Sequence, residues 1–501
     1  MASILAGTKR QAGSPDRVAA TPAAAAGLAG LVAVALVLRL VPVLLVPSLD
    51  WPDELFQATE QAHRLVFGTG LIPWEFQFGV RSWLLPGAIA GIMEAARILG
   101  DGPDVYLTAI AVVFAALATA PVVCVFLWAR RWFGLAGALV AGSVVATAPD
   151  LVYLGARTLS EVVAAHLLVI ALYLIEPGHP VASRRRLVGA GLLLGLAAAL
   201  RIQIAPAILV MIAWRVSRAS VMPVLAGLAV AIAFAAVLDA STLGAPLASI
   251  TRYVADNLFA GVSSFYGVSD ASFYAWFEVS LWSVGLALPL CLMLLGAKRL
   301  PLALVAALVI VTEHQLVGHK EYRFLYPAIL LGFMLAGFGL AQVAQHGKEA
   351  LEARGIEPTA ASFAAAATCI LGWSIVSLEI WMAPGFAALR GVAHDGLAAA
   401  SFVARDAKAC GIGLSLDQGE HDWVYGSYTY LSRPVPRYWF KDKAELTATA
   451  PAFNTLIAIR PPPPQLGYKS VQCFGAACVF ERAGGCIPLP MKSLPVPDPL
   501  Q

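Results

Sequence analysis

The sequence has little charge: Lys, Arg, Asp and Glu make up 13% of its 501 residues, about half the share that is usual in soluble domains. It has no phosphate-binding loop of the Walker type, no Cys/His spacing typical of zinc and no EF-hand calcium loop. The net charge of +3 is small for this length, so nucleic acid is not an expected partner. Nothing in the sequence requires a metal or another cofactor.

Hydrophobic residues are abundant instead, at 59% of the chain, with a mean hydropathy of +0.75. Many apolar runs approach the roughly 20 residues that cross a bilayer as a helix. We therefore predict an all-α polytopic membrane protein, with the lipid bilayer as a partner and about eleven spans. The spans are predicted at 22–47, 104–128, 135–150, 160–176, 187–200, 202–214, 220–240, 276–296, 300–315, 324–343 and 359–382.

The basic connectors predict the orientation, because short loops rich in Lys and Arg stay in the cytoplasm. Counting from a cytoplasmic N-terminus places every such connector on the inner side, and one span more or fewer would invert all that follow. These connectors are Arg130-Arg131, Arg184-Arg185-Arg186, Arg215 with Arg218, Lys298-Arg299 and, more weakly because of nearby acids, Lys348 with Arg354.

The predicted organisation has three parts: a cytoplasmic tail (1–21), a transmembrane domain (22–382) and an extracytoplasmic C-terminal domain (383–501). Outer loops are expected at about 48–103, 241–275 and 316–323. The C-terminal part is rich in Pro and contains short β-like runs, FNTLIAIR and ACVFER. These runs indicate a small α/β module.

A basic cluster lies in the third outer loop, HKEYRF, where the positive-inside rule disfavours Lys320 and Arg323. Together with His319 they are suitable donors for a phosphate, and Glu321 partly balances their charge. The alternative is that the two cations are snorkelling side chains at a helix end.

An acidic cluster lies in the first outer loop, where Asp50, Asp53 and Glu54 follow the first span. A general base there, facing the basic cluster, would suit group transfer from a lipid phosphate. The alternative is that these acids only cap the helix that begins at Pro52.

Four segments resemble glycosyltransferase family 22, the polyprenyl- or dolichyl-phosphate-mannose-dependent mannosyltransferases of GPI-anchor and N-glycan synthesis. WPDELFQATEQAHRLVFGTG with PWEF and RS resembles the family's first luminal loop. ARTLSE, DNLFAGVSSFYG and HKEYRFLYP resemble its R-T-L-S, N-L-x-x-G-x-S and H-K-E-x-R-F segments. They occur in the family's order, each at a position that the topology places outside.

The resemblance implies a GT-C fold and an inverting transfer of mannose from a polyprenyl-phosphate-mannose donor to a glycolipid or glycan acceptor. In that reading Asp53 is the base and Glu54 orients it or the acceptor. His319, Lys320 and Arg323 hold the donor phosphate, and Glu321 fixes their side chains.

Three departures from the family pattern leave the acceptor and the sugar open. Trp51 stands where the family often has His, Tyr322 stands where an acid is frequent, and ASFYAWF lacks the usual histidine. A GT-C enzyme that uses another polyprenyl-phosphate sugar therefore stays an alternative. A transporter or flippase of lipid-linked sugars is a further one, although the inverted repeats expected of it are not seen.

Arg39, Arg157 and Arg201 lie in or beside predicted spans, where charged groups usually face a protein interior or a wet cavity. They are possible supporting residues for the lipid phosphate. Pairing of Arg157 or Arg201 with Glu161 or with loop acids is the alternative.

Four of the seven cysteines, Cys410, Cys473, Cys478 and Cys486, lie in the C-terminal part, and the other three lie in predicted spans. An even set in an oxidising compartment predicts two disulfides, and four cysteines allow three pairings. We favour Cys473–Cys478 with Cys410–Cys486. The Ala-, Leu- and Gly-rich composition favours a bacterial inner membrane with a periplasmic C-terminus; in a eukaryote the ER membrane would be expected.

Overall fold

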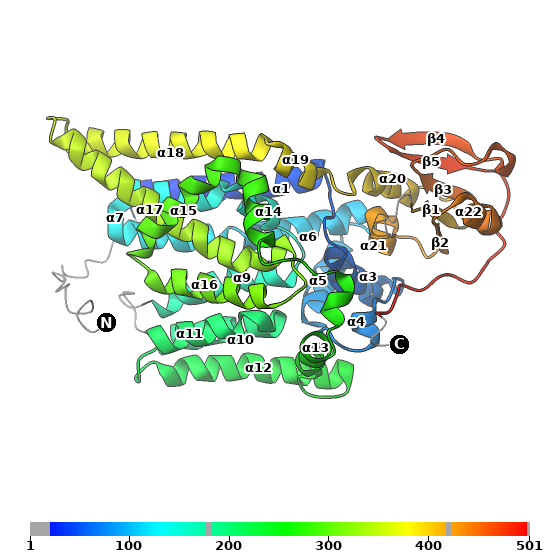
Figure 1. Cartoon of the computed structure of the whole chain (residues 1–501), viewed down its shortest axis with the longest axis horizontal. Coiled ribbons are helices and arrows are strands. Elements are labelled where there is room, and N and C mark those ends of the chain that lie inside the picture. The colour runs from blue at the N-terminus through cyan, green and yellow to red at the C-terminus, as the bar shows by residue number, and fades with distance from the viewer. Residues whose placement is uncertain (1–20, 177–182, 417–421, 498–501) are drawn as a thin grey trace.

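The computed structural model describes residues 21–176, 183–416 and 422–497, so all of the predicted cytoplasmic tail except Thr21 lies outside the described residues. A bundle of long helices forms one end of the molecule and a small sheet forms the other (Figure 1). Short helices of the first outer loop lie between them.

Each predicted span coincides with helical chain, although the boundaries differ by a few residues. Among the described residues, six helical stretches are long and apolar enough to cross a membrane by length and composition, and α9, α11 and α16 are apolar but shorter. The bundle helices are α1 (Pro22–Leu45), α6 (Pro103–Leu117), α7 (Ala120–Thr147), α9 (Ser160–Ile175), α10 (Arg184–Leu200), α11 (Ala205–Arg215), α12 (Val221–Leu243), α14 (Phe273–Trp282), α15 (Ala287–Ala297), α16 (Pro301–Leu316), α17 (Tyr326–Glu352) and α18 (Pro358–Met382).

The break between the second and third predicted spans lies inside α7. Gly134 has φ +71° there, a conformation that glycine adopts without a steric penalty. The helical chain that starts at Pro103 therefore kinks at Gly134, between the two predicted spans.

Small residues let the helices approach closely, as is usual in membrane bundles. A Cβ at Gly191 of α10 would lie 1.9 Å from the Val224 carbonyl oxygen of α12. A Cβ at Gly339 of α17 would lie 2.0 Å from the Leu292 carbonyl oxygen of α15. Both pairs therefore depend on glycine at the contact.

The outer loops consist of short helical pieces rather than further long helices. The first loop holds α2 (Pro52–Glu54), a π-helical turn η1 (Leu55–Thr59), α3 (Glu60–Phe67), α4 (Trp74–Gln77) and α5 (Leu84–Ala96). The second holds α13 (Ala248–Val254), and the third contains a 3₁₀ turn, η6 (Tyr322–Leu325), before α17.

The C-terminal part contains a five-stranded sheet, which confirms the predicted small α/β module. Strand order is β2-β1-β3-β5-β4, with β2, β1 and β3 parallel and β5 and β4 antiparallel to their neighbours. Its elements are α19 (Pro384–Gly391), α20 (His394–Ala404), β1 (Ile412–Ser415), α21 (Ser427–Leu431), β2 (Arg437–Phe440), α22 (Lys443–Thr449), β3 (Thr455–Ala458), β4 (Lys469–Phe474) and β5 (Ala477–Glu481).

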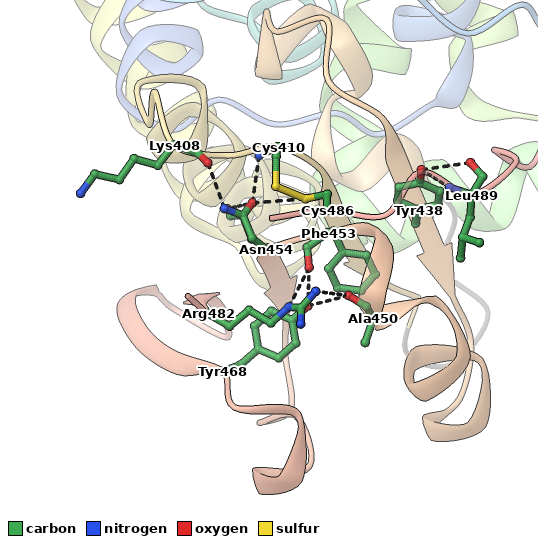
Figure 2. Close-up of a disulfide and its surroundings, with 11 residues drawn as sticks. Lys408, Cys410, Tyr438, Ala450, Phe453, Asn454, Tyr468, Arg482, Cys486 and Leu489 are labelled. Carbon is green, nitrogen blue, oxygen red and sulfur yellow. Dashed lines mark hydrogen bonds between the residues drawn. A yellow bond between two sulfur atoms is a disulfide. The ribbon is translucent and has the colours of Figure 1, made fainter. Parts of the chain in front are cut away.

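The favoured disulfide pairing is confirmed: Cys410 bonds to Cys486 and Cys473 to Cys478. The second closes the β4–β5 hairpin. Figure 2 shows the first, with the Asn454 amide beside it. That amide accepts a hydrogen bond from the Cys410 backbone N–H and donates one to the Lys408 carbonyl, both at 2.9 Å.

Glu60 of α3 joins this module to the first outer loop. Its carboxylate is fully buried and accepts hydrogen bonds from the Ser427 hydroxyl (2.7 Å), the Thr429 hydroxyl (2.7 Å) and the Thr429 backbone N–H (3.0 Å). The backbone N–H groups of Tyr428 and Leu71 also donate to it. The start of α21 is therefore fixed on the loop that carries the acidic cluster.

The variant Glu60→Gln places an amide NH₂ against these donors and should weaken the docking. A buried hydrogen bond to a charged group contributes roughly 1.5–3 kcal/mol, so we expect at least a tenfold faster proteolytic cleavage in the 383–393 segment. Glu94→Gln, at an exposed carboxylate on α5, is the control. Equal cleavage rates in both variants would contradict the role of Glu60.

Candidate active site

Asp53 and Glu54 are neighbours on α2, yet they face different surroundings. The Asp53 side chain is 23% exposed and lines a cavity between the first outer loop and the ends of α9 and α10. The Glu54 side chain is 4% exposed and lines a second cavity on the α1 and α6 side. One turn of helix therefore presents one carboxylate to each cavity.

Arg323 of η6 is the centre of the site. Its buried guanidinium contacts three carboxylates: Nη2 lies 2.5 Å from Asp53 Oδ2, Nη1 lies 2.9 Å from Glu161 Oε1, and Nε donates to Glu321. The planar fork of arginine suits such multiple contacts. The first outer loop, α9 and the HKEYRF loop are joined at this point.

Glu161 extends the cluster to Arg201. Its Oε2 accepts a hydrogen bond from the Ser160 hydroxyl at 3.0 Å and lies 3.8 Å from Arg201 Nη1. The Arg201 guanidinium is buried and also lies 4.8 Å from the Phe324 ring centroid. Arg201 therefore pairs with Glu161 rather than with a loop acid, and both pairings were considered from the sequence.

Arg157 pairs with a loop acid instead. Its Nη1 lies 3.0 Å from Glu54 Oε1, and it also donates to the carbonyl and hydroxyl oxygens of Ser48. Burial raises the pKa of Glu54 despite the opposing charge of Arg157. The Trp51 ring centroid lies 5.8 Å from the Arg157 guanidinium carbon and 5.9 Å from that of Arg323, so Trp51 separates the two ion pairs.

His319 and Glu321 continue the Arg323 cluster outwards. His319 Nε2 lies 2.9 Å from Glu321 Oε1, and its Nδ1 lies 3.1 Å from the Gly267 carbonyl oxygen. Burial opposes ionisation of Glu321, but Arg323 and His319 together lower its pKa to about 2. Glu321 is thus ionised and contacts both basic side chains.

Two predicted residues lie apart from this cluster. Lys320 is buried and donates to the backbone carbonyls of Val317 (2.6 Å) and Ser269 (3.4 Å), so it joins the second and third outer loops. Arg39 donates to the carbonyls of Ala146, Val145 and Ala35 at 2.9–3.1 Å and holds α1 against the end of α7.

Arg81 was missed by the sequence analysis, although it is the Arg of the quoted RS dipeptide. It lines the Asp53 cavity, which has a volume of about 60 Å³ and also includes Gln203 and Tyr253. Its guanidinium lies 5.0 Å from the Tyr253 ring centroid, and its buried Nε has no hydrogen-bond partner in the described residues. Unlike Arg323, it has donors available to a ligand.

Glu75 was also missed, although it is the Glu of the quoted PWEF. It is buried, and its Oε1 accepts a hydrogen bond from the Gln57 amide at 2.7 Å. Burial and then the Asp53 charge raise the pKa of Glu75 to about 7, against the opposing charge of Arg81. Glu75 therefore titrates near neutral pH in the neighbourhood of Asp53.

Over the ranges that the structure describes, no group of three or more His, Cys, Asp or Glu side chains is arranged to hold a metal ion. Of the carboxylates near Asp53, Glu161 and Glu321 pair with Arg323, and Glu75 accepts a hydrogen bond from Gln57.

The structure resembles that of ArnT from Cupriavidus metallidurans bound to undecaprenyl phosphate, with a TM-score of 0.57 and 16% identity over 92% of this chain and 99% of that chain. The apo structure of the same protein gives a TM-score of 0.56. These likenesses confirm the predicted GT-C fold.

The chain belongs to the Alg9-like mannosyltransferase family, which matches residues 31–393. It is 32% identical over 304 residues to GPI mannosyltransferase 3 of Yarrowia lipolytica, covering 58% of each chain. It is 32% identical over 140 residues to GPI mannosyltransferase 3 of Drosophila melanogaster, covering 27% of this chain and 24% of that protein. The chain thus spans less than two thirds of the length of these relatives, and the expected family is confirmed.

The raised pKa of Glu75 predicts that the stability of the folded protein depends on pH. Its pKa is about 7 in the folded protein against an ordinary 4.5, so the folded state binds more protons between these values and loses stability as the pH rises through them. This group should lower the free energy of unfolding by up to about 3 kcal/mol between pH 5 and pH 8. In Glu75→Gln, the Tm measured in detergent should therefore fall less over that range than in wild type.

The control for this measurement is Glu94→Gln, which removes an exposed carboxylate from α5 and should keep the wild-type pH dependence. A Glu75→Gln protein with the wild-type pH dependence would show that Glu75 ionises at its ordinary pKa.

Proposed function

We propose that this protein transfers mannose from a polyprenyl-phosphate-mannose donor to a hydroxyl group of a lipid-linked or glycan acceptor at the outer side of the membrane. One observation carries the proposal: the Asp53 carboxylate faces a polar cavity beside Arg81 and Arg323. Membership of a mannosyltransferase family supports mannose as the sugar.

Asp53 acts as the general base. It accepts the proton of the acceptor hydroxyl while that oxygen forms a bond to the anomeric carbon of mannose. The bond from that carbon to the phosphate oxygen breaks, and its electron pair leaves with the polyprenyl phosphate. A single displacement converts a β-linked donor into an α-linked product without a covalent sugar–enzyme intermediate.

Arg323 and Arg81 have different roles, because they differ in the hydrogen-bond donors that remain available to a ligand. The fork of Arg323 is occupied by three carboxylates, so its role is to orient Asp53 and to supply positive potential. Arg81 contacts the donor phosphate directly, because it lines the Asp53 cavity and its Nε has no hydrogen-bond partner in the described residues. Lys320 and Arg39 act through the backbone segments that they join.

The positions of the basic connectors support the outer side as the side of reaction, since they place the first and third outer loops away from the cytoplasm. The disulfides in the C-terminal part support the same orientation, because disulfides persist in oxidising compartments. The N-terminus is then cytoplasmic and the C-terminus periplasmic, or luminal in a eukaryote.

Asp53→Asn tests the base. Turnover should fall about 10²–10⁴-fold, because the amide cannot take the acceptor proton, while donor binding should change less than threefold. The measurement is transfer of radiolabelled mannose from polyprenyl-phosphate-mannose to lipid extract by purified protein. Asp101→Asn, at an exposed carboxylate, is the control; turnover of Asp53→Asn within a few-fold of the control would remove Asp53 from this role.

Arg81→Gln tests the phosphate contact. It should weaken binding of a labelled polyprenyl phosphate at least tenfold, because it removes a charge-assisted contact worth roughly 1.5–3 kcal/mol. Arg97→Gln, at an arginine on the exposed side of the same loop, should bind like wild type. Unchanged binding in Arg81→Gln would place the phosphate elsewhere.

A further inference from the structure

A second cavity, of about 530 Å³, lies on the Glu54 side of α2. One wall of this cavity is apolar. It comes from the end of α1, including Val41, Leu44 and Leu45, and from α6. Val41, Leu44 and Leu45 are more than 40% exposed. This wall is therefore suited to the chain of a membrane lipid.

The opposite end of the cavity is polar. Glu54 and Arg157 line it, and the buried Arg157 Nε has no hydrogen-bond partner in the described residues. Thr158 lines both this cavity and the Asp53 cavity. Thr158, whose hydroxyl donates to the Glu54 carbonyl, therefore lies between the two cavities, next to the α2 turn that carries both carboxylates.

Tyr430 of α21 also lines the polar end, although it lies 376 positions after Glu54 in the chain. Glu60 fixes Ser427 and Thr429 on the same short helix, and Tyr106 donates its hydroxyl hydrogen to the Thr429 carbonyl. Leu49, Phe56 and Leu397 pack beside Tyr430 in one apolar cluster. The ring is therefore packed against this cluster, while its hydroxyl has no hydrogen-bond partner among the described residues.

We infer that the C-terminal module recognises the acceptor. In this inference, an acceptor glycolipid binds in the second cavity, and Tyr430 forms a hydrogen bond with its hydroxylated head group. This inference rests on the proposed function. The hydroxyl of Tyr430 and the carboxylate of Glu54 suit sugar hydroxyl groups, and the apolar wall suits the lipid chain.

The charges favour the acceptor over the donor in this cavity. The charge of Arg157 is balanced by Glu54 at 3.0 Å, whereas Arg81 lines the Asp53 cavity together with Arg323, where two guanidinium groups suit a phosphate. The family match ends at residue 393, so the Tyr430 wall comes from outside the part that the family shares. Acceptor choice can thus differ from that of relatives without a change in the transfer chemistry.

Tyr430→Phe tests this inference, with Tyr468→Phe as the matched control. The Tyr468 hydroxyl donates to the Phe453 carbonyl at 2.8 Å, as drawn in Figure 2, and Tyr468 does not line the cavity. The probes are radiolabelled polyprenyl-phosphate-mannose and a glycolipid fraction extracted from the host membrane.

Tyr430→Phe should raise the half-saturating concentration of the glycolipid fraction about 3- to 10-fold, as expected for one lost hydrogen bond. Its slow hydrolysis of the donor by water, without acceptor, should stay at the control rate. Tyr430→Trp, which puts a bulkier ring without a hydroxyl group at the polar end of the cavity, should lose transfer and keep hydrolysis. An unchanged half-saturating concentration, or an equal loss of donor hydrolysis, overturns the inference.

A second measurement separates this inference from the proposed function. The glycolipid fraction alone should raise the Tm of wild type, and Tyr430→Phe should reduce that rise by at least half. An equal rise in both proteins overturns the role of Tyr430. Wild-type protein that is stabilised by the fraction but neither hydrolyses nor transfers mannose refutes the proposed function and leaves the acceptor cavity supported.

Discussion

The buried guanidinium of Arg323 is the constraint on which the rest of the site depends. It holds carboxylates from the first outer loop, from α9 and from its own loop, namely Asp53, Glu161 and Glu321. Removing one partner of a buried ion pair costs roughly 3–5 kcal/mol, so these segments are strongly held in register. The position of the proposed base is therefore set by the helix bundle rather than by the loop alone.

The α2 turn gives the site two sides, because its two carboxylates face different cavities. Asp53 faces the small polar cavity and Glu54 the larger amphipathic one, with Trp51 between their arginine partners. Tyr322, which stands where the family often has an acid, donates a hydrogen bond to the buried Asp150. An acid at 322 would face that carboxylate, so this departure from the family pattern has a local physical reason.

Much of the fold could be predicted from the sequence, because long apolar runs and basic connectors are local signals. The spans, the strands in FNTLIAIR and ACVFER and the disulfide pairing all match the structure. The residues selected from the sequence motifs also include members of the Arg323 cluster. The roles of Arg81, Glu60 and Tyr430 could not be predicted, because each depends on contacts with segments distant in the chain. No local pattern shows that Glu60 meets Thr429 or that Arg81 faces Asp53.

The central claim is that Asp53 acts as a base in a single displacement, and the anomeric configuration of the first product tests it most directly. Purified protein is given β-linked polyprenyl-phosphate-mannose and a saturating glycolipid fraction, and the new linkage is assigned by NMR from the one-bond C1–H1 coupling. The account predicts an α-linked product. A β-linked product would mean retention of configuration, by two displacements or by attack on the same face, and would contradict the single inverting displacement in which Asp53 is the base.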